Sequence, residues 1–495
     1  MEQGQSVPLN SDSLSQISRT VPVPRYDRNA TKARILHLGV GGFHRAHMAY
    51  YTHELLQAGK SDWSINGVGL TEHDRPMAET LKAQEGLYTL IARSAESEEP
   101  AVIGSITNYH FSPAGSRDLC RRAADEDYRI ISLTVTENGY HYKGDERDLD
   151  FDDPVIAQDV SDPENPQSAV GFIFRVAQLR LASGRKLPTF LSCDNLPHNG
   201  STLRKLVLQY GGRVDPETAA TLEKEGCFPN CMVDRITPGT TDKERAYVRE
   251  TLGIEDRWPV VCEDFIQWFI EENFSDGRPP WEEVGAALVP DVTPYELMKI
   301  RLLNGSHSAL SYISYLLGYR HVDDAMADEE VRAFVERYMR EIEPAVGEVP
   351  GVDLREYQKK LVERFSNPAI RDQVLRLCED GSRKIPNMML EPMAELLSSG
   401  TSVTHGAFAI AAWIRFLQGS DEEGQTIPIK DPNAQIVQEA ARQCEDDVSP
   451  FINLDFVFPG RLRENSQFKE EVLSWFRRLR DEGARRSIHG ILESN

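Results

Sequence analysis

The stretch Ile35-Leu-His-Leu-Gly39-Val-Gly41-Gly42-Phe-His44 predicts a buried strand that runs through a glycine turn into a helix. Glycine lets such a turn tighten and lets the backbone approach a pyrophosphate, whose charge then lies at the helix N-terminus. The third glycine of the G-x-G-x-x-G pattern is missing, because His44 occupies its place. The loop alone leaves two interpretations open, a dinucleotide site and an α/β turn without a ligand. As a dinucleotide site, its candidate cofactor contacts are Gly39, Val40, Gly41, Gly42 and Phe43.

Strands and helices are predicted to alternate from residue 34 onward. The predicted strands are 35–40, 63–70, 101–111, 128–136 and 189–194, and the helices between them include 46–58 and 166–181. This alternation predicts an α/β domain with a doubly wound, mostly parallel sheet. We expect a Rossmann-like, NAD-binding domain over residues 1–290, with 1–33 as an N-terminal arm.

After about residue 290 the pattern changes, because helical periodicity dominates and no comparable strands follow. The predicted helices are 295–318, 328–342, 354–365, 370–379, 388–397, 407–417, 434–445 and 468–483. A mainly α-helical second domain over residues 291–495 is therefore expected.

The second predicted strand ends in Thr71-Glu72-His73-Asp74, where a Rossmann domain places its ribose-binding carboxylate. A carboxylate at Glu72 can accept hydrogen bonds from both ribose hydroxyls and would repel a 2′-phosphate. The sequence therefore favours NAD over NADP, although Arg75 is nearby. The alternative for Glu72 is a solvated loop acid.

A predicted helix at the start of the second domain carries four polar groups on one otherwise apolar face. Thr293-Pro294 is a typical helix start, with threonine as N-cap and proline in the first turn. At about 100° per residue from Lys299, Glu296 falls at about 60° and His307 at about 80°. Asn304 falls at about 140° on the same broad face. We expect this face to build a site, the alternative being an unusual set of satisfied core groups.

Three further segments place polar side chains where predicted strands end, and ligand-facing loops of α/β sheets gather at such ends. They supply the candidates Thr136, Glu137, Asn195, Asn199 and Asp234. Each residue taken singly has a commoner structural role, such as turn formation for asparagine. Together they favour a site at the junction of the two domains.

Hydride removal from a secondary alcohol needs a base for the hydroxyl proton, donors for the developing oxyanion and a nicotinamide against the carbon. Lys299 can be that base if burial and neighbouring donors depress its pKa. Asn195 and Asn304 can donate hydrogen bonds without carrying charge. His307 can bond the reacting oxygen or orient the lysine, and Glu296 or Glu137 can relay the proton.

The composition excludes several classes of partner. The chain has 495 residues, a net charge of −23 and no long basic run, which argues against nucleic acid or an anionic membrane. No apolar run approaches the ~18 residues of a membrane span, and the polar N-terminus is unlike a signal peptide. We therefore expect a cytoplasmic protein. The 7 scattered cysteines are typical of reduced thiols, and no ligand set has metal-site spacing, so we predict no metal.

These segments together resemble the polyol-specific long-chain dehydrogenases, the mannitol dehydrogenase family. The shared stretches occur in family order over nearly the whole chain: HLGVGGFHRAH, SLTVTENGY, SCDNLPHNG, FPNCMVDRITP, CEDFIQWFIE, KIRLLNGSHSAL and DGSRKIP. The resemblance implies an expanded Rossmann domain followed by a largely helical one, with the active site between them. It also implies a monomer that oxidises a polyol to a ketose with NAD and without zinc.

The resemblance assigns roles to the matching positions. Lys299 would be the general base, and Asn195 and Asn304 the pair that stabilises the oxyanion. His307 would contact the substrate or position the lysine. The remaining assignments are proton relay for Glu137 and Glu296, and polyol binding for Asp234, Arg376 and Lys384, with Asn199 as a further candidate and Arg383 beside Lys384 as a competing cation.

Within the family the main choice lies between a neutral pair, mannitol and fructose, and a sugar-acid pair, mannonate and fructuronate. The residues of the motifs along the whole chain look closer to those of the mannitol and fructose enzymes, while Arg376, Arg383 or Lys384 could bind the carboxylate of a sugar acid. Arabinitol and sorbitol are further alternatives. A non-catalytic dinucleotide-binding regulator is a different class, since fold alone does not fix function. A hydrolase is disfavoured because no G-x-S-x-G elbow occurs.

Overall fold

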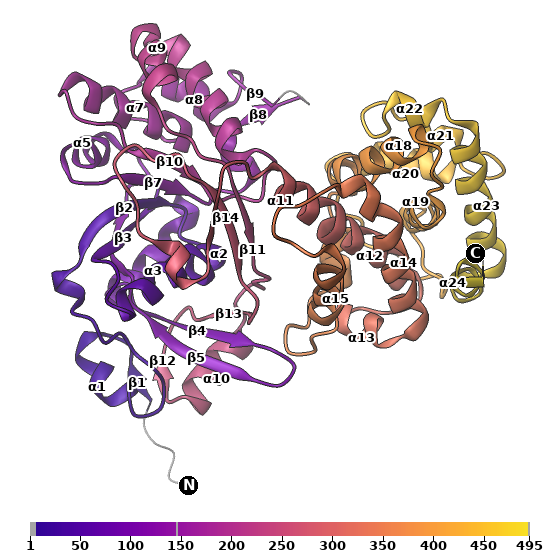
Figure 1. Cartoon of the computed structure of the whole chain (residues 1–495), viewed down its shortest axis with the longest axis horizontal. Coiled ribbons are helices and arrows are strands. Elements are labelled where there is room, and N and C mark those ends of the chain that lie inside the picture. Colours follow the sequence, from indigo (N-terminus) through magenta and orange to yellow (C-terminus); the bar gives the residue numbers. More distant parts are fainter. Residues whose placement is uncertain (1–5, 145–146, 494–495) are drawn as a thin grey trace. The chain divides into compact units, whose positions relative to one another are not determined.

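The chain divides into two compact units between Val292 and Thr293. The structure is a computed structural model that describes residues 6–144 and 147–493. Figure 1 shows strands and helices together in the first unit and helices in the second. The predicted class, an α/β domain followed by a mainly helical one, is confirmed by these elements.

The core of the first unit is a parallel sheet of five strands in the order β10-β7-β2-β3-β6. The strands are β2 (Lys32–Leu38), β3 (Trp63–Gly69), β6 (Ile106–Phe111), β7 (Ile130–Leu133) and β10 (Thr189–Ser192). The chain starts in the middle at β2, builds outward to β6, and then returns to add β7 and β10 on the other side. The strand order thus reverses between β2 and β7, which is where ligands bind in doubly wound sheets.

Successive side chains of β2 pack into two separate hydrophobic cores, because side chains along a strand point alternately to the two faces of the sheet. Ile35 packs with residues of the helix after the glycine loop, and Leu36 packs in the core on the opposite face. The helices around the sheet are α2 (Gly42–Ala46), α3 (Met48–Gln57), α4 (Arg75–Ala83), α5 (Arg117–Asp125), α7 (Ala169–Ala182) and α8 (Asn199–Val214), and α9 (Pro216–Glu225) packs on α7 and α8.

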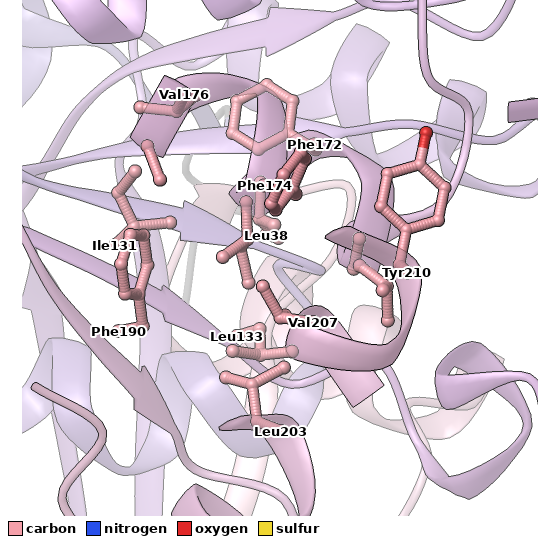
Figure 2. Packing of buried hydrophobic residues seen from close by; sticks show 14 of the residues in the cluster. Leu38, Ile131, Leu133, Phe172, Phe174, Val176, Phe190, Leu203, Val207 and Tyr210 are labelled. Atoms are coloured by element: carbon pink, nitrogen blue, oxygen red, sulfur yellow. The ribbon is translucent and has the colours of Figure 1, made fainter. Parts of the chain in front are cut away.

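Figure 2 shows the core on the α7 and α8 face of the sheet. The strands contribute Leu38, Ile131, Leu133 and Phe190, and the two helices contribute Phe172, Phe174, Val176, Leu203, Val207 and Tyr210. All of these side chains are buried. Burying one large apolar side chain stabilises the fold by about 1.5–3 kcal/mol, so this packing fixes the positions at which β7 and β10 end.

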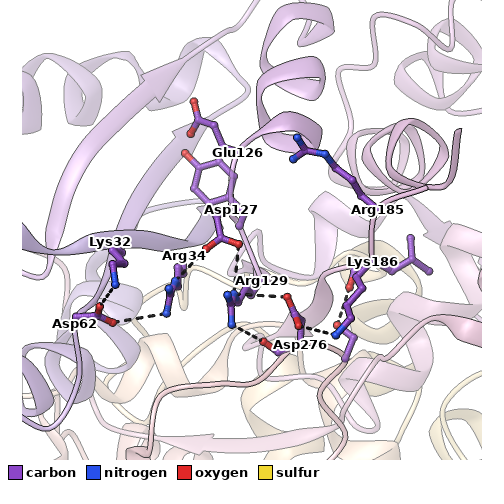
Figure 3. A network of polar contacts seen from close by, with 12 residues as sticks. Lys32, Arg34, Asp62, Glu126, Asp127, Arg129, Arg185, Lys186 and Asp276 are labelled. Atoms are coloured by element: carbon purple, nitrogen blue, oxygen red, sulfur yellow. Dashed lines mark hydrogen bonds and ion pairs between the residues drawn. The ribbon is translucent and has the colours of Figure 1, made fainter. Parts of the chain in front are cut away.

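Ion pairs line the opposite edge of the sheet, where the parallel strands begin (Figure 3). Asp62 pairs with Lys32 and Arg34, and Asp127 pairs with Arg34 and Arg129. The network continues from Arg129 through Asp276 to Lys186. Partly exposed pairs of this kind contribute about 0–1 kcal/mol each. The charged side chains at this edge thus pair with one another and stabilise the fold. Ligands of doubly wound sheets bind at the other edge, where the strands have their carboxyl ends.

Two predicted elements of the first unit are interrupted in the structure. The predicted strand over 101–111 is two strands: β5 (Glu98–Ile103) pairs antiparallel with β4 (Tyr88–Arg93), and β6 joins the main sheet. The chain changes sheet at Gly104–Ser105, where the Ser105 hydroxyl donates to the Ala49 carbonyl at 2.6 Å. The predicted helix over 46–58 is likewise interrupted, because His47 separates α2 from α3 with φ −118° and ψ −96°.

Smaller elements extend the first unit beyond the main sheet. One sheet has the order β13-β4-β5 and another the order β11-β14-β15. The remaining elements of this unit are β1 (Val7–Pro8), α1 (Leu14–Ile17), β8 (Tyr142–Lys143), β9 (Asp148–Leu149), α6 (Pro154–Ser161), β11 (Cys231–Asp234), α10 (Asp242–Thr251), β12 (Ile254–Glu255), β13 (Val260–Glu263), β14 (Gln267–Glu271) and β15 (Ala287–Val289).

The described part of the second unit, residues 293–493, contains helices and no strand. Its helices are α11 (Thr293–Met298), α12 (Gly305–Leu316), α13 (Val322–Ala327), α14 (Glu329–Val346), α15 (Leu354–Phe365), α16 (Val374–Cys378), α17 (Gly381–Ile385), α18 (Glu391–Ser398), α19 (Thr404–Leu417), α20 (Ala434–Arg442), α21 (Ser449–Ile452), α22 (Gly460–Arg463), α23 (Ser466–Glu482) and α24 (Ala484–Glu493). α12 is buried along nearly its whole length and packs against α16 and α19. None of the described helices is both long and apolar enough to cross a membrane.

Candidate functional site

The glycine turn after β2 is shaped by a close approach between two backbone segments. Gly39 has φ +83°, and a Cβ added there would lie 2.3 Å from the Thr134 carbonyl oxygen. The Thr134 hydroxyl donates to the Gly39 carbonyl at 2.7 Å. Gly41 differs, because no described atom lies within 4 Å of a Cβ built on it. Gly39 is therefore required by the protein itself, whereas Gly41 leaves the backbone open to an approaching ligand.

The other predicted cofactor contacts in this loop are only partly available. The Val40 side chain is buried in the core beside Gly67, so only its backbone can face a ligand. Gly42 begins α2, and Phe43 is half-buried and stacks on His47 at 4.9 Å between ring centroids. The strand, the glycine turn and the helix are found as predicted, and binding of a cofactor by the backbone of this loop stays a prediction.

His44, at the position of the third glycine, stacks flat on His37, with ring centroids 3.4 Å apart. The His37 ring bonds Ser132 at 2.8 Å and Thr134 at 3.0 Å. Burial lowers the pKa of His37 to about 3 and that of His44 well below its ordinary value. Two neutral imidazoles therefore fill the space between helix and strand that glycine would leave open.

Glu72 lies just beyond β3, in the short 3-10 helix Glu72–Asp74. Its carboxylate is exposed and accepts from both Nε and Nη2 of Arg75, at 2.8 and 2.9 Å. Arg75 in turn lies over the Phe111 ring at the end of β6. The predicted position of Glu72 after the second strand is found, but the arginine already binds the carboxylate at both oxygens.

The loop after β7 contains a residue in an unusual conformation. Thr136 has φ 62° and ψ 168°, a region that only glycine occupies routinely. Thr136 and Glu137 are both exposed, and the Glu137 carboxylate accepts a hydrogen bond from the Tyr142 hydroxyl. A strained threonine beside the switch point of the sheet indicates a functional loop.

Asp194, which the sequence did not single out, organises the end of β10. It is buried, and its carboxylate accepts from the backbone N–H groups of Val135 at 3.1 Å and Thr136 at 2.9 Å. The Tyr140 hydroxyl adds a third bond at 2.8 Å. Burial raises the pKa of Asp194 to about 6, although these three donors oppose the rise. The sequence signal that points to Asp194 is its position, since it is an acidic residue directly before the candidate Asn195.

Asn195 is exposed in the loop between β10 and α8, whereas Asn199 is fully buried. The Asn199 amide nitrogen donates to the carbonyls of Asp194 at 3.0 Å and Cys231 at 2.8 Å. Its amide oxygen accepts from the backbone N–H groups of Gly200 and Cys231. Asn199 therefore joins the start of α8 to β11, and its amide is engaged by the protein instead of facing a ligand.

Asp234 ends β11 and is buried beside the register partner Gln267 of β14. The neighbouring Arg235 donates to the carbonyls of Ala46 and Glu263 and lies over the Tyr50 ring. In this acid–base pair, the arginine is thus a structural link between α2 and β13.

The predicted helix over 295–318 differs most from expectation. Residues Lys299–Asn304 form a π-helix between α11 and α12, so one angle of about 100° per residue does not describe them. The Gly305 N–H bonds the Ile300 carbonyl five residues back. π-Helical turns are rare in proteins and frequently lie at functional sites. The angles predicted for Asn304 and His307 relative to Lys299 assume a regular α-helix, and they are therefore wrong.

A second π-helix, Pro386–Leu390, contacts the first one within the same unit. The contact is close at Gly305, where an added Cβ would lie 2.9 Å from the Tyr338 hydroxyl and 3.0 Å from the Met388 carbonyl. Arg301 forms two 2.7 Å bonds with the Glu395 carboxylate. These contacts hold the π-helical turn in place within the second unit.

The polar residues of this segment lie on three consecutive elements. Glu296 on α11 and Lys299 in the π-helix are buried, and the His307 ring on α12 lies against the Phe365 ring, with centroids 4.2 Å apart and planes tilted by 34°. The side-chain oxygen of Asn304 is buried without a hydrogen-bond partner among the described residues. A buried polar atom left in this state is costly, so this oxygen is a candidate to bond a ligand or a water molecule.

Arg376 and Lys384 lie on either side of Asp380 in the second unit. The Arg376 guanidinium pairs with Asp372, and the Lys384 ammonium donates to the Glu379 carbonyl at 2.8 Å. Burial lowers the pKa of Lys384 below its ordinary value, with Asp380 opposing. Arg383 is exposed and Lys384 half-buried, so the lysine is the cation turned toward the protein.

Among the described residues, no group of three or more His, Cys, Asp or Glu side chains is arranged to hold a metal ion. The seven cysteines are all free thiols. In the first unit, the glycine turn and the strained loop after β7 offer backbone groups at one edge of the sheet. In the second, a π-helical turn presents a lysine and an amide.

Known proteins match this chain over its whole length. A solved structure of Pseudomonas fluorescens mannitol 2-dehydrogenase, a ternary complex with NAD and D-mannitol, is 39% identical with a TM-score of 0.89 and covers 99% of this chain and 100% of its own. A substrate-free D-sorbitol dehydrogenase is 33% identical with a TM-score of 0.88, covering 97% and 100%. Mannitol 2-dehydrogenase of Aspergillus fumigatus is 40% identical over 97% of this chain and 98% of its own.

Two family descriptions account for the two parts of the chain. The mannitol dehydrogenase Rossmann domain matches residues 33–283, and the mannitol dehydrogenase C-terminal domain matches residues 291–480. A Rossmann sheet with a glycine turn at its switch point, followed by a helical unit, defines a dinucleotide-dependent oxidoreductase fold. The chain belongs to the mannitol dehydrogenase family, as its motifs predict.

Proposed function

We propose that this protein oxidises D-mannitol to D-fructose with NAD as the hydride acceptor. The observation that carries the proposal is the similarity, over essentially the full length of both chains, to the P. fluorescens enzyme solved with NAD and D-mannitol. The similar D-sorbitol dehydrogenase supports a neutral polyol as substrate class. Neither relative is named for a sugar acid.

The first unit would hold NAD through the glycine turn and the loop after β7. Gly41 leaves space for a close approach of the pyrophosphate, and the N-terminus of α2 follows directly. Glu72 would accept from the ribose hydroxyls, with Arg75 keeping its carboxylate in place. NAD supplies the acceptor for the hydride when bound, and the protein supplies position and proton transfer.

In the second unit, Lys299 would remove the hydroxyl proton as the alcohol carbon loses its hydride. A buried lysine is suited to this because desolvation disfavours its charged form. Asn304 and Asn195 would hold the oxygen as charge develops on it, which amides do without adding charge of their own. The buried amide oxygen of Asn304 has no hydrogen-bond donor among the described residues, so it could accept from a substrate hydroxyl while the NH₂ group donates to the reacting oxygen.

The remaining residues would support this chemistry. His307 would orient the lysine or contact the substrate, and Glu296 and Glu137 would pass the proton onward. Asp234, Arg376 and Lys384 would bind the polyol hydroxyls. Asn199 is better placed to support the loop that carries Asn195 than to contact substrate, because protein groups engage both ends of its amide. No step in this scheme requires a metal.

The decisive assay is initial-rate reduction of NAD and NADP over mannitol, sorbitol, arabinitol, mannonate and altronate, with and without a chelator. We expect D-mannitol and NAD to give the highest kcat/KM, with no effect of the chelator. Activity with the sugar acids alone would refute the neutral-polyol proposal. NADH binding with no polyol oxidation at all would instead indicate a non-catalytic member.

Two further expectations belong to this proposal, a monomeric state and a cytoplasmic location. Sedimentation velocity at micromolar concentration would show a single species near the 55.8 kDa mass of the chain. A concentration-dependent larger species would contradict the monomer. Imaging of a tagged full-length chain in its own cells tests the location.

A further inference from the structure

We propose that Asp194 is a positioning residue, whose carboxylate holds the loop after β7 in its working conformation while its backbone holds the loop that carries Asn195. The inference rests on the proposed function, because it assigns these loops to cofactor and oxyanion binding. It concerns the first unit alone, in which all of the contacts lie.

The carboxylate divides its hydrogen bonds unequally between its two oxygens. Oδ1 accepts from the Thr136 N–H at 2.9 Å, and Oδ2 accepts from the Val135 N–H at 3.1 Å and the Tyr140 hydroxyl at 2.8 Å. Tyr140 is fixed in turn by the Ser192 hydroxyl at 2.6 Å. These three donors are uncharged, and Asp194 is buried. Only an acceptor with two oxygens satisfies all three donors.

The conformation of Thr136 explains why such a holder is needed. With φ 62° and ψ 168°, the threonine lies in a region that β-branched residues avoid. A backbone of this kind persists only where its surroundings over-determine it. The carboxylate accepts from the N–H groups of Val135 and Thr136, and the second of these belongs to the peptide bond that leads into Thr136, so Asp194 holds the distorted backbone directly.

The backbone of Asp194 makes the second half of the link. Its carbonyl accepts from the Asn199 amide at 3.0 Å and from the Leu196 N–H at 2.9 Å, which closes the turn around Asn195. Asn199 also bonds both backbone groups of Cys231 on β11. Asp194 therefore connects the carboxyl ends of β7 and β10 and, through Asn199, the start of β11.

The same linkage reaches the glycine turn. Thr134, which directly precedes the pair that Asp194 holds, donates to the Gly39 carbonyl at 2.7 Å. Loosening Asp194 should thus disturb the proposed NAD cradle as well as Asn195. This separates the role of Asp194 from that of a residue that only stabilises the fold.

Replacing Asp194 by asparagine tests the carboxylate with almost no change in shape. The amide can keep one oxygen toward Val135 and Tyr140, but its NH₂ group then faces the Thr136 N–H, donor against donor. We expect D194N to raise the Kd for NADH, measured by fluorescence without polyol, by about fivefold or more, and to lower kcat by about tenfold or more.

A matched control is Asp159→Asn in the same unit. Asp159 is also buried and also accepts from two backbone N–H groups, those of Gln167 and Ser168, but its contacts lie between α6 and α7. D159N should cost stability while leaving the Kd for NADH and the kcat of the folded enzyme within about twofold of wild type. Equal losses of NADH affinity in D194N and D159N would show that Asp194 only stabilises the fold, and would overturn the proposal.

The Thr136→Gly substitution supplies a rescue test. Glycine adopts positive φ without support, so D194N should weaken NADH binding less in the T136G background than in the Thr136 background. If D194N alone does not fold, the double variant decides. A folded double variant with NADH affinity within about threefold of T136G supports the proposal, and an unfolded or equally weakened one contradicts it.

These readouts also separate this inference from the proposed function. If the wild-type protein binds NADH but oxidises no polyol, the proposed function fails, while the NADH affinities of D194N, D159N and the T136G pair still decide the role of Asp194. Unchanged NADH affinity and unchanged kcat in D194N would overturn the positioning role whatever the substrate is.

Discussion

Gly39 and Thr134 approach so closely that a Cβ on residue 39 would lie 2.3 Å from the Thr134 carbonyl oxygen. This contact joins the turn after β2 to the loop after β7, on the two sides of the point where strand order reverses. Gly41, two residues later, has no described atom within 4 Å of an added Cβ. Two glycines of one motif therefore serve different purposes.

Alanine at each glycine should separate these purposes. Gly39→Ala should destabilise the first unit by about 1–3 kcal/mol, since it adds a clash and a strained φ of +83°. Gly41→Ala should leave the melting temperature unchanged and raise the KM for NAD, because its Cβ enters the space proposed for the pyrophosphate. Thermal melts and NAD saturation curves for both variants test this. Loss of stability at Gly41, or normal NAD binding at both positions, would contradict the cradle.

The π-helical turn should be sensitive to a methyl group at Gly305. Its Cβ would meet the Tyr338 hydroxyl at 2.9 Å and the Met388 carbonyl at 3.0 Å. Since Asn304 precedes this residue, Gly305→Ala should lower kcat by about tenfold or more through misplacement of the amide and Lys299. Gly212→Ala on α8, where nothing lies within 4 Å, is the matched control and should stabilise by up to about 1 kcal/mol. A fully active G305A enzyme would show that the π-turn geometry does not matter.

Glu72 should set the preference for NAD over NADP. Glu72→Gln removes the charge that repels a 2′-phosphate and frees Arg75, which the carboxylate now binds through both oxygens. The ratio of kcat/KM for NADP to that for NAD should therefore rise by about tenfold. Asp118→Asn is the control, because Asp118 pairs with Arg121 at the same spacing on α5. An unchanged ratio in E72Q would exclude Glu72 from the ribose site.

Because of Asp194, the free energy of unfolding should fall as pH rises, whereas activity should rise. Burial raises its pKa from 3.8 to about 6, so the folded state holds the proton more tightly than the unfolded chain between these values. Its contribution to the free energy of unfolding therefore falls as pH rises through this window and is constant above it. Between about pH 4.5 and 7.5, the stability of wild type relative to D194N should fall by roughly 2 kcal/mol.

Activity should show the reverse dependence, because only the ionised carboxylate accepts from both backbone N–H groups. The wild-type kcat/KM should fall as pH drops below about 6, and the D194N enzyme should lack this limb. Urea unfolding and pH–rate profiles of the two proteins provide the measurement. A stability difference that grows with pH would show that the pKa of Asp194 is lowered by the fold.

Local pattern was sufficient to predict the Rossmann sheet and the helical second unit. Ile35 and Leu36 face opposite cores, and the glycine turn follows the first strand, so periodicity and turn chemistry carried the information. The break at Gly104–Ser105 was missed because β5 pairs with β4, a contact that the pattern of 101–111 does not contain.

The site was predictable in its residue types more than in its geometry. The π-helical turn at Lys299–Asn304 packs against α14 and the π-helix Pro386–Leu390, which lie far along the chain and are not visible in the local pattern. Asp194 was overlooked because its partners, the N–H groups of Val135 and Thr136, are backbone atoms that no side-chain motif displays. The sequence around Asn199 is that of a turn near a ligand. Its actual role, hydrogen bonding to Cys231, depends on a strand of another sheet, which the local sequence does not reveal.

The most direct test is the initial rate of NADH formation from D-mannitol and NAD by the wild-type protein and by Lys299→Ala, under identical conditions and at saturating NAD. We expect a readily measured wild-type rate and a fall of about 100-fold or more in the variant, with NADH binding retained. A wild-type protein inactive on mannitol, or a K299A variant with near-normal turnover, would contradict mannitol oxidation with Lys299 as the base.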